Sequence, residues 1–418
     1  MQSLPNVTIR KMKKILIFTG RILASIILFA VFVLSLFSLS PIYRFEGPVP
    51  FKGDMIYNPY ADLDTATGWK RACLHTHTKV DKGINECPYY PDVVYSDYMS
   101  YGYGILGFSN HQALTPHPVD SSLYIAIYEH GYNLFKFHLN AFGAGKVEKF
   151  DHILPILLSQ KQFMIDRLAS QGDFVQFNHP DRTISVNRRV MEHLSGYRLI
   201  EGDSGFGESD NGSGTSLSHW DEALSAGRYA HNNISDDNHN SKAHARIARR
   251  CSWINSPTPY WEDVREQLVK GNFYTTRVPD FGSGDTAVKH SENMKLPGIK
   301  DIGLHGDTVF MTLTEPAALI KVISRNGMAV DSAKNTASIH YVMKAGDPYV
   351  RMTAWYDNGV ALYTNAFARY AEGDSPYRVF PHPVRWGMTI LWNLMVIFVA
   401  TASLFCIFRL FRRKRRSI

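Results

Sequence analysis

The most informative residues of this 418-residue chain are its histidines, because 13 of the 17 lie between residues 75 and 244. Several stand in short motifs beside an acid or an amide: His75-Thr76-His77, Asn110-His111, Glu129 followed by His138, Asn178-His179-Pro180 and Asp237-Asn238-His239. In extended backbone, residues i and i+2 point to the same side, so the imidazoles of His75 and His77 can face one ion. Imidazoles and carboxylates are common ligands of transition metals in proteins. The spacing therefore indicates a metal centre.

Each motif has a simpler explanation when it is taken alone. His111 and His138 would then be hydrogen-bonded structural histidines. Glu129 would be a solvated strand end, and His179-Pro180 would be part of a turn. Together the motifs are harder to explain, because five predicted strand ends each carry an imidazole and two also carry a carboxylate. In a barrel of alternating strands and helices these ends meet at one rim, where such groups need a cation.

With these motifs the sequence resembles the PHP phosphoesterases, the polymerase and histidinol phosphatase family. The resemblance covers roughly residues 69–275 and lies in LHTHT at 74–78, SNHQ at 109–112, Glu129 with His138, FNHP at 177–180 and SDDNH at 235–239. It implies an α/β fold, a distorted (βα)7 TIM-like barrel, with two or three divalent ions, usually Zn, Mn or Fe. It implies the following ligands, with Glu129 bridging two ions: His75, His77, His111, Glu129, His138, His179, Asp237 and His239.

Two positions depart from the family pattern. Where the family has an Asp ligand after the HxH motif, this chain has Lys82, and the neighbouring acid is Asp81. Asp81 is therefore carried over as a further metal ligand. The family's Asp-His pair is Asn110-His111 here, which removes a carboxylate from beside the imidazole. Either change could lower the occupancy of one ion or alter specificity.

The chemistry that these ligands predict is hydrolysis by a water that the metals activate. Attack on phosphorus leaves an oxygen that needs a proton, and Asp237 or His239 would be placed to give it. Phosphate binding also needs a cation near the metals. Arg182 is the first choice, followed by Arg277 and Lys79, although an ordinary surface cation explains each of them equally well.

The elements that would position these residues follow an α/β pattern. From about residue 69 to 274, short apolar strands alternate with helical stretches, which predicts a mainly parallel sheet. The segment Asp151–Ser170 is predicted to be a long amphipathic helix with Asp151 as its N-cap. We expect a linker at 41–65, the barrel at 66–285 and a small β-rich module at 286–380.

Both ends of the chain carry an uncharged apolar run, which predicts a transmembrane helix at 22–40 and another at 386–408. Their lengths approach or exceed what a hydrocarbon core of about 30 Å needs. Basic residues lie outside both runs, so the positive-inside rule places residues 1–21 and 409–418 in the cytoplasm and the part between the runs on the far side. A cleaved signal peptide ending near Ser40 is the alternative for the first run.

The net charge of +7 comes from these two ends. The first 21 residues have five basic residues and no acid, and the last ten have six basic residues, so the remainder carries −4. A mildly acidic body gives a nucleic-acid partner no electrostatic support. The four cysteines have no CxxC spacing, which excludes a thiolate zinc site and leaves a Cys73–Cys87 bridge open.

The sequence thus predicts a membrane-anchored metal-dependent phosphoesterase whose catalytic part lies outside the cytoplasm. The expected substrate is a phosphorylated lipid headgroup, glycan or small metabolite. One alternative is a metallohydrolase of the same fold that cleaves a non-phosphate ester, amide or carbamate. The other is a binding or scaffolding protein with a degenerate barrel, which Lys82 and Asn110 favour and the many retained histidines oppose.

Overall fold

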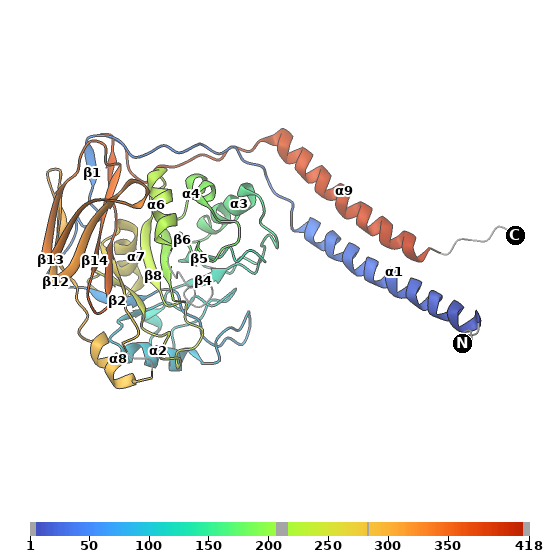
Figure 1. Cartoon of the computed structure of the whole chain (residues 1–418), viewed down its shortest axis with the longest axis horizontal. Coiled ribbons are helices and arrows are strands. Elements are labelled where there is room, and N and C mark those ends of the chain that lie inside the picture. The colour runs from blue at the N-terminus through green and yellow to red at the C-terminus, as the bar shows by residue number, and fades with distance from the viewer. Residues whose placement is uncertain (1–5, 206–215, 282–283, 413–418) are drawn as a thin grey trace, which may run out of the picture. The chain divides into compact units, whose positions relative to one another are not determined.

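The computed structural model describes residues 6–205, 216–281 and 284–412, which form two compact units (Figure 1). The first, called the helical unit, contains the chain up to residue 44, residues 151–163 and the chain from residue 382 onward. The second, called the sheet unit, contains residues 45–150 and 164–381. The sheet unit has the mixed α/β character that the sequence predicted, and it carries every candidate site residue.

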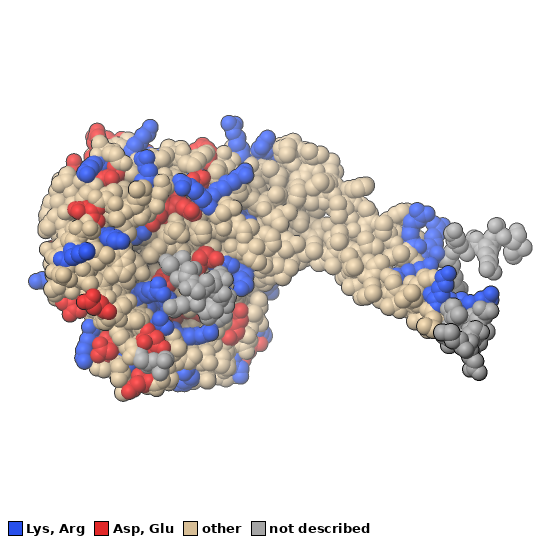
Figure 2. Space-filling view, viewed as in Figure 1, with Lys and Arg blue, Asp and Glu red and all other residues tan. Residues whose placement is uncertain are grey.

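The helical unit is built on two long helices, α1 (Asn6–Leu36) and α9 (Trp386–Phe411), which pack against each other. By length and composition both are able to cross a membrane. Basic side chains of this unit gather where its two chain ends lie, and the helices behind them present a face of uncharged residues (Figure 2).

The bounds of these helices differ slightly from the expected segments. The first helix ends at Leu36, so residues 37–40 of the segment expected at 22–40 lie beyond it, in a stretch that contains two serines and leads into Pro41. Helix α9 includes the whole of 386–408 and continues to Phe411. The end of the expected basic tail, residues 413–418, lies outside the described residues.

A set of polar contacts joins the end of α1 to the start of α9. Backbone groups released at a helix end need new partners, and here side chains of α9 provide them. The hydrogen bonds are Trp392 Nε1–H to Ser38 O (3.0 Å), Ser40 N–H to Asn393 Oδ1 (3.1 Å) and Ile42 N–H to Thr389 Oγ1 (2.9 Å). The helices are therefore held together by directional bonds as well as by apolar packing.

Helix α3 (Leu158–Ala169) begins later than the sequence predicted. The expected helix started at Asp151, but residues 151–157 are not helical and include Pro155, which cannot continue a helix through its interior. The Asp151 carboxylate accepts the backbone N–H of His152 at 2.7 Å. The His152 ring in turn donates to Phe37 O at 2.7 Å, so this segment packs within the helical unit.

Two β-sheets form the sheet unit. The large sheet contains β1 (Met55–Tyr57), β2 (Lys70–Cys73), β3 (Ile105–Leu106), β9 (Arg250–Ile254), β10 (Phe273–Arg277), β11 (Ile299–His305), β12 (Thr308–Ser324), β13 (Met328–Val342), β14 (Tyr349–Trp355), β15 (Ala361–Thr364) and β16 (Phe367–Tyr370). The small sheet contains β4 (Ile127–His130), β5 (Leu139–Phe142), β6 (Phe174–Phe177), β7 (Leu199–Ser204) and β8 (His231–Ser235), in this order.

Short helices connect the strands, and local sequence explains their ends. They are α2 (Pro91–Ser100), α4 (Arg188–His193), α6 (Leu217–Ser225), α7 (Trp261–Lys270) and α8 (Thr286–Asn293), with single 3-10 turns η1 (Ser121–Leu123) and η2 (Arg325–Gly327). Pro91 fits the first turn of α2 because its φ is already helical and its missing N–H is not needed there. Helix α7 ends where Gly271 adopts a φ of 82°, a left-handed C-cap that favours glycine.

The strand ladders alone do not form the expected closed barrel. Among the described residues no continuous ladder closes the strands into a ring, and most neighbouring strands of the large sheet are antiparallel. Parallel pairing is confined to β2 with β3, β6 with β7 and β7 with β8. Two single-residue parallel bridges connect the edges of the sheets, Thr76 with Asn238 and His111 with Glu129. The predicted alternation of strands and helices is confirmed, but alternation alone does not determine whether neighbouring strands pair parallel or antiparallel.

The β-rich stretch near the C-terminus is continuous with the large sheet. Strands β11 to β16 are antiparallel, and β15 pairs with β10. Strand β1, inside the segment expected to be a linker, pairs with β16. The boundaries at 65, 285 and 380 therefore stay predictions. The cysteines form no bridge, since Cys73, Cys87 and Cys251 are buried free thiols and Cys406 is an exposed one.

Candidate metal centre

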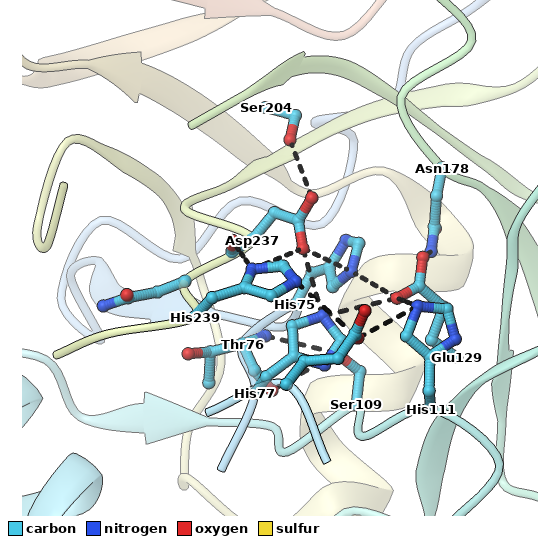
Figure 3. A network of polar contacts seen from close by, with 12 residues as sticks. His75, Thr76, His77, Ser109, His111, Glu129, Asn178, Ser204, Asp237 and His239 are labelled. Atoms are coloured by element: carbon cyan, nitrogen blue, oxygen red, sulfur yellow. Dashed lines mark hydrogen bonds and ion pairs between the residues drawn. The ribbon is translucent and has the colours of Figure 1, made fainter. Parts of the chain in front are cut away.

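The motif histidines of the sheet unit converge at the ends of the strands. Residues His75 and His77 follow β2, and Asp237 and His239 follow β8. Two backbone hydrogen bonds hold these segments together, Asp237 N–H to His75 O at 3.0 Å and His77 N–H to Asn238 O at 2.9 Å. Figure 3 shows the side chains of His75, His77, His111, Asp237 and His239 around Glu129, which lies on β4.

Two of the converging residues have a strained backbone. His179, directly before Pro180, has a φ of 25°, and Asp237 has a φ of 46°. Positive φ is unfavourable for side chains with a Cβ and persists only where surrounding contacts enforce it. The surrounding contacts therefore hold both residues in an unfavourable backbone conformation that directs their side chains into the cluster.

The first group of candidate ligands is His75, His77, Glu129 and Asp237, all buried. His75 Nε2 lies 3.3 Å from Glu129 Oε2 and 3.2 Å from Asp237 Oδ1. His77 Nε2 lies 3.3 Å and 3.1 Å from the same two oxygens. In a tetrahedral site with metal–ligand bonds of about 2.0–2.1 Å, neighbouring ligand atoms are about 3.3 Å apart. The four atoms thus have the spacing that such an ion requires.

Glu129 also faces a second group of imidazoles. Its Oε1 lies 3.1 Å from His138 Nδ1 and 3.2 Å from His179 Nε2, and His111 Nε2 lies 3.0 Å from its Oε2. His111, Glu129 and His138 could hold an ion together. The two oxygens of one carboxylate are therefore turned toward different sets of imidazoles, which is the geometry that a bridging ligand needs.

A third group contains a residue that the sequence did not reveal. His77, Glu86 and His239 could hold an ion, and Glu86 Oε2 also lies 3.2 Å from His111 Nε2. The expected ligand Asp81 is exposed instead, and among the described residues it forms no ion pair. Because Glu86 lies further along an irregular loop, no strand spacing or motif pointed to it. Asp81 therefore stays a predicted ligand, and Glu86 is the acid of this segment that lies in the cluster.

A buried nitrogen without a hydrogen-bond partner supports a cation in the first group. His75 Nδ1 lies 3.0 Å from Glu201 Oε1, so this nitrogen carries the proton and donates it to the carboxylate. In the neutral ring, Nε2 then presents a lone pair toward the two oxygens of Glu129 and Asp237, and this Nε2 has no hydrogen bond. A lone pair facing carboxylates is repulsive, so positive charge is needed between them, either from a proton taken up by the ring or from a bound metal ion. The residues present therefore fit a divalent metal.

The electrostatics keep the carboxylates ionised and draw positive charge to the centre. Burial lowers the pKa of the His75 imidazole, but the carboxylates of Glu201, Asp237 and Glu129 outweigh burial and raise that pKa well above its usual value, so a metal ion would bind there in competition with a proton. Burial raises the pKa of the Glu129 carboxyl, but the imidazoles of His111, His75 and His138 lower it by more, to well below its usual value. Burial also raises the pKa of the Asp237 carboxyl, and the surrounding imidazoles again outweigh it. Burial lowers the pKa of the His138 imidazole to about 4. Ionised carboxylates and neutral imidazoles are the forms that coordinate a cation.

Of the three candidate phosphate-binding cations, Arg182 contacts the ligand set. Its Nη1 donates to Asp237 Oδ2 at 3.0 Å. Arg277 pairs instead with Asp203 on β7, at 3.7 Å. Lys79 Nζ lies over the ring of Tyr90, 4.6 Å from its centroid.

Asn110, where the sequence departs from the family pattern, has a structural role. Its Oδ1 accepts the backbone N–H of Thr78 at 2.7 Å, and its Nδ2 donates to the hydroxyl of Thr115 at 2.6 Å. The amide thus ties the segment after His77 to the loop after β3. These contacts explain an uncharged side chain that can both donate and accept at this position.

Comparisons with known proteins add little to this geometry. No protein-family model matches the sequence, and no curated protein matches it. One solved structure, a two-domain protein from Bacteroides vulgatus described as containing a predicted PHP-like metal-dependent phosphoesterase, is similar over 77% of this chain and 99% of its own. The identity is 14% and the TM-score 0.36. With a similarity of this size, the side chains of the centre remain the evidence for function.

Replacing each acid of the Asp81–Glu86 loop by its amide, in separate variants, tests which of the two is a metal ligand. Glu86→Gln should weaken metal binding by more than about tenfold, because it removes an anionic ligand atom and outer-shell changes alone already have effects of about 10- to 100-fold. Asp81→Asn, the matched control, should leave binding unchanged. Metal content after equilibrium dialysis against buffered zinc measures both, and the reverse ranking would contradict the assignment.

Proposed function

We propose that this protein is a membrane-anchored metal-dependent phosphoesterase that hydrolyses a phosphorylated lipid headgroup, glycan or small metabolite outside the cytoplasm. The observation that carries the proposal is the position of the Glu129 carboxylate, whose two oxygens face separate sets of buried imidazoles. Such an arrangement suits two or three neighbouring divalent ions, Zn, Mn or Fe. Bound ions of this kind lower the pKa of a water and screen the charge of phosphoryl oxygens.

The candidate ligands divide into one group for each ion. His75, His77, Glu129 and Asp237 would hold one ion. Further ions would use His111 and His138 with Glu129, joined by His179, and Glu86 and His239 with His77. This assignment keeps every expected ligand except Asp81, which Glu86 replaces.

Arg182 supports a phosphoester in preference to a carboxylic ester. Its guanidinium is already directed at the centre by Asp237, and its side chain is only 9% exposed. A planar guanidinium binds two phosphoryl oxygens at once, which suits a phosphate more than a neutral carbonyl. Of the two expected proton donors, Asp237 is ionised and has no proton to give, so the leaving oxygen would take its proton from His239, whose side chain is 19% exposed and so accessible to a substrate.

The two isolated bridges support a distorted seven-stranded barrel. They connect the chain after β3 with β4 and the chain after β2 with the chain after β8. Together with the ladders β2–β3 and β4–β5–β6–β7–β8, they would complete a ring of seven strands at the end where the centre lies. A ring of this kind would bring all the ligand-bearing segments to one rim.

The two terminal helices support a membrane location with both termini in the cytoplasm. Both have sufficient length and apolar composition, and the sequence carries basic residues before the first apolar run and after the second. The Ser38 carbonyl, near the position where a signal peptidase would cut, accepts the indole N–H of Trp392. An uncleaved first helix agrees with this bond.

Hydrolysis of simple esters by the purified full chain in detergent tests the proposed reaction. With Mn²⁺ or Zn²⁺ it should release p-nitrophenol from p-nitrophenyl phosphate, and a chelator should abolish the activity until metal is restored. His75→Ala should lower kcat by at least about 100-fold, since it removes a ligand of the first group. Cleavage of p-nitrophenyl acetate alone would favour the non-phosphate hydrolase. Fewer than one metal per chain with no turnover would favour the binding protein.

The role of Arg182 predicts a specific kinetic change. Arg182→Gln should raise KM for phosphoesters by about 10- to 100-fold, the size expected from losing a charge-assisted hydrogen bond of about 1.5–3 kcal/mol. Metal content measured in parallel should stay unchanged. Lys79→Gln is the control and should leave KM unaltered. An equal KM for wild type and Arg182→Gln would remove Arg182 from phosphate binding.

Topology is tested by protease protection of tagged membranes. With an epitope tag at each end, both tags should be protected in intact cells stripped of any outer layer and become accessible once the membrane is opened. An intact N-terminal tag on the mature chain would also show that the first helix is retained. Loss of that tag during maturation would leave a single anchor, α9.

A further inference from the structure

The buried carboxylate of Glu201 lies just outside the candidate ligands and was not foreseen in the sequence. It belongs to β7 and its side chain is fully buried. Its Oε1 accepts from His75 Nδ1 at 3.0 Å and from the Ser235 hydroxyl, and its Oε2 accepts the backbone N–H of His179 at 3.0 Å. One side chain therefore contacts two candidate ligands that come from different strands.

The first of these contacts determines which nitrogen of His75 faces the centre. A carboxylate can only accept, so the proton of the neutral imidazole is held on Nδ1. Nε2 is then left with its lone pair toward Glu129 and Asp237, at 3.3 Å and 3.2 Å. If the proton moved to Nε2, this ring could no longer bind an ion through that atom.

The second contact acts on the backbone of His179. With a φ of 25°, this residue needs a bond that holds it in an unfavourable conformation. The hydrogen bond to Glu201 Oε2 is such a bond, and it sets the ring so that Nε2 lies 3.2 Å from Glu129 Oε1. His75 faces the other oxygen of Glu129. Glu201 therefore contacts one histidine on each side of the Glu129 carboxylate.

We propose that Glu201 is a positioning residue that fixes the tautomer of His75 and the backbone of His179, and so sets the metal affinity on both sides of Glu129. This inference rests on the metal centre of the proposed function. The rival explanation is a purely structural carboxylate that closes a buried polar network with Ser235. A positioning residue should weaken metal binding when its charge is removed, whereas a purely structural carboxylate should leave metal binding unchanged.

Cobalt binding to the purified full chain tests the inference. Wild type, titrated with Co²⁺ in detergent, should develop the visible absorption of a low-symmetry site. Glu201→Gln cannot accept at both former oxygens, and it should weaken Co²⁺ binding by about 10- to 100-fold and shift the band. At saturating metal, kcat for p-nitrophenyl phosphate should fall while KM changes little. Unchanged affinity and spectrum in Glu201→Gln would overturn the inference.

Two variants separate positioning from folding. Ser235→Ala removes the hydroxyl donor but keeps both ligand contacts, so its Co²⁺ affinity should stay close to that of wild type. Asp221→Asn removes a different buried carboxylate, which Arg351 holds at 2.8 Å and 2.6 Å, and should lower the unfolding temperature without changing the Co²⁺ spectrum. An Asp221→Asn spectrum altered like that of Glu201→Gln would mean that general destabilisation explains both, and would overturn the inference.

The same experiment separates the role of Glu201 from the existence of the metal centre. Failure of wild type to bind Co²⁺ at all would remove the metal centre itself. Normal binding by both wild type and Glu201→Gln would remove only the role of Glu201. If Glu201→Gln does not fold, ¹⁵N NMR of histidine-labelled wild type loaded with Zn²⁺ decides, with the His75 signal assigned by its loss in His75→Gln. A proton on Nδ1 and a metal-bound Nε2 are expected, and a metal-bound Nδ1 would overturn the inference.

Discussion

The ionised carboxylate of Glu129 at the centre of several buried imidazoles is the interaction on which the rest of the site depends. It is almost fully buried, so its charge is stable only because positive or polarisable groups surround it on both sides. Five histidines lie within 3.3 Å of its two oxygens. Four buried ring nitrogens of these histidines have no hydrogen-bond partner: His75 Nε2, His77 Nδ1, His111 Nδ1 and His179 Nδ1. The need to satisfy them explains why so much polar structure is buried here.

The surrounding scaffold works mainly to keep each ligand in one orientation. Asn178 Nδ2 donates to Glu129 Oε1 at 3.0 Å, and this hydrogen bond fixes the orientation of the carboxylate. Asp236, next to Asp237, accepts the Tyr98 hydroxyl at 2.9 Å and the backbone N–H of Arg250 at 2.8 Å. This residue anchors the loop so that its neighbour can turn inward with an unfavourable φ. A rigid support of this kind limits the reorganisation needed when an ion or a charged substrate arrives.

The convergence of the motif histidines with Glu129 and Asp237 was predictable because each of these residues lies in a short local pattern. The HxH motif uses the two-residue period of extended chain, and Asn178-His179-Pro180 lies where a strand must stop. The positions of Glu86 and Glu201 were not predictable, because each depends on contacts between segments distant in sequence. The start of α3 was missed because Asp151 and the apolar period suggested a continuous helix across Pro155. The parallel sheet was partly wrong for a similar reason, since alternation of strands and helices does not determine strand direction.

The chain passes between the two units four times, because residues 151–163 pack within the helical unit while the stretches on either side of them belong to the sheet unit. Within the helical unit, Tyr43 forms an antiparallel bridge with Val384, and the N–H of Arg44 donates to Pro383 O at 2.9 Å. A protease that cuts on one side of the sheet unit would therefore not release it, because the chain stays connected to the other terminal helix. Shedding a soluble form would require two separate cuts and the loss of the contacts that residues 151–163 make within the helical unit.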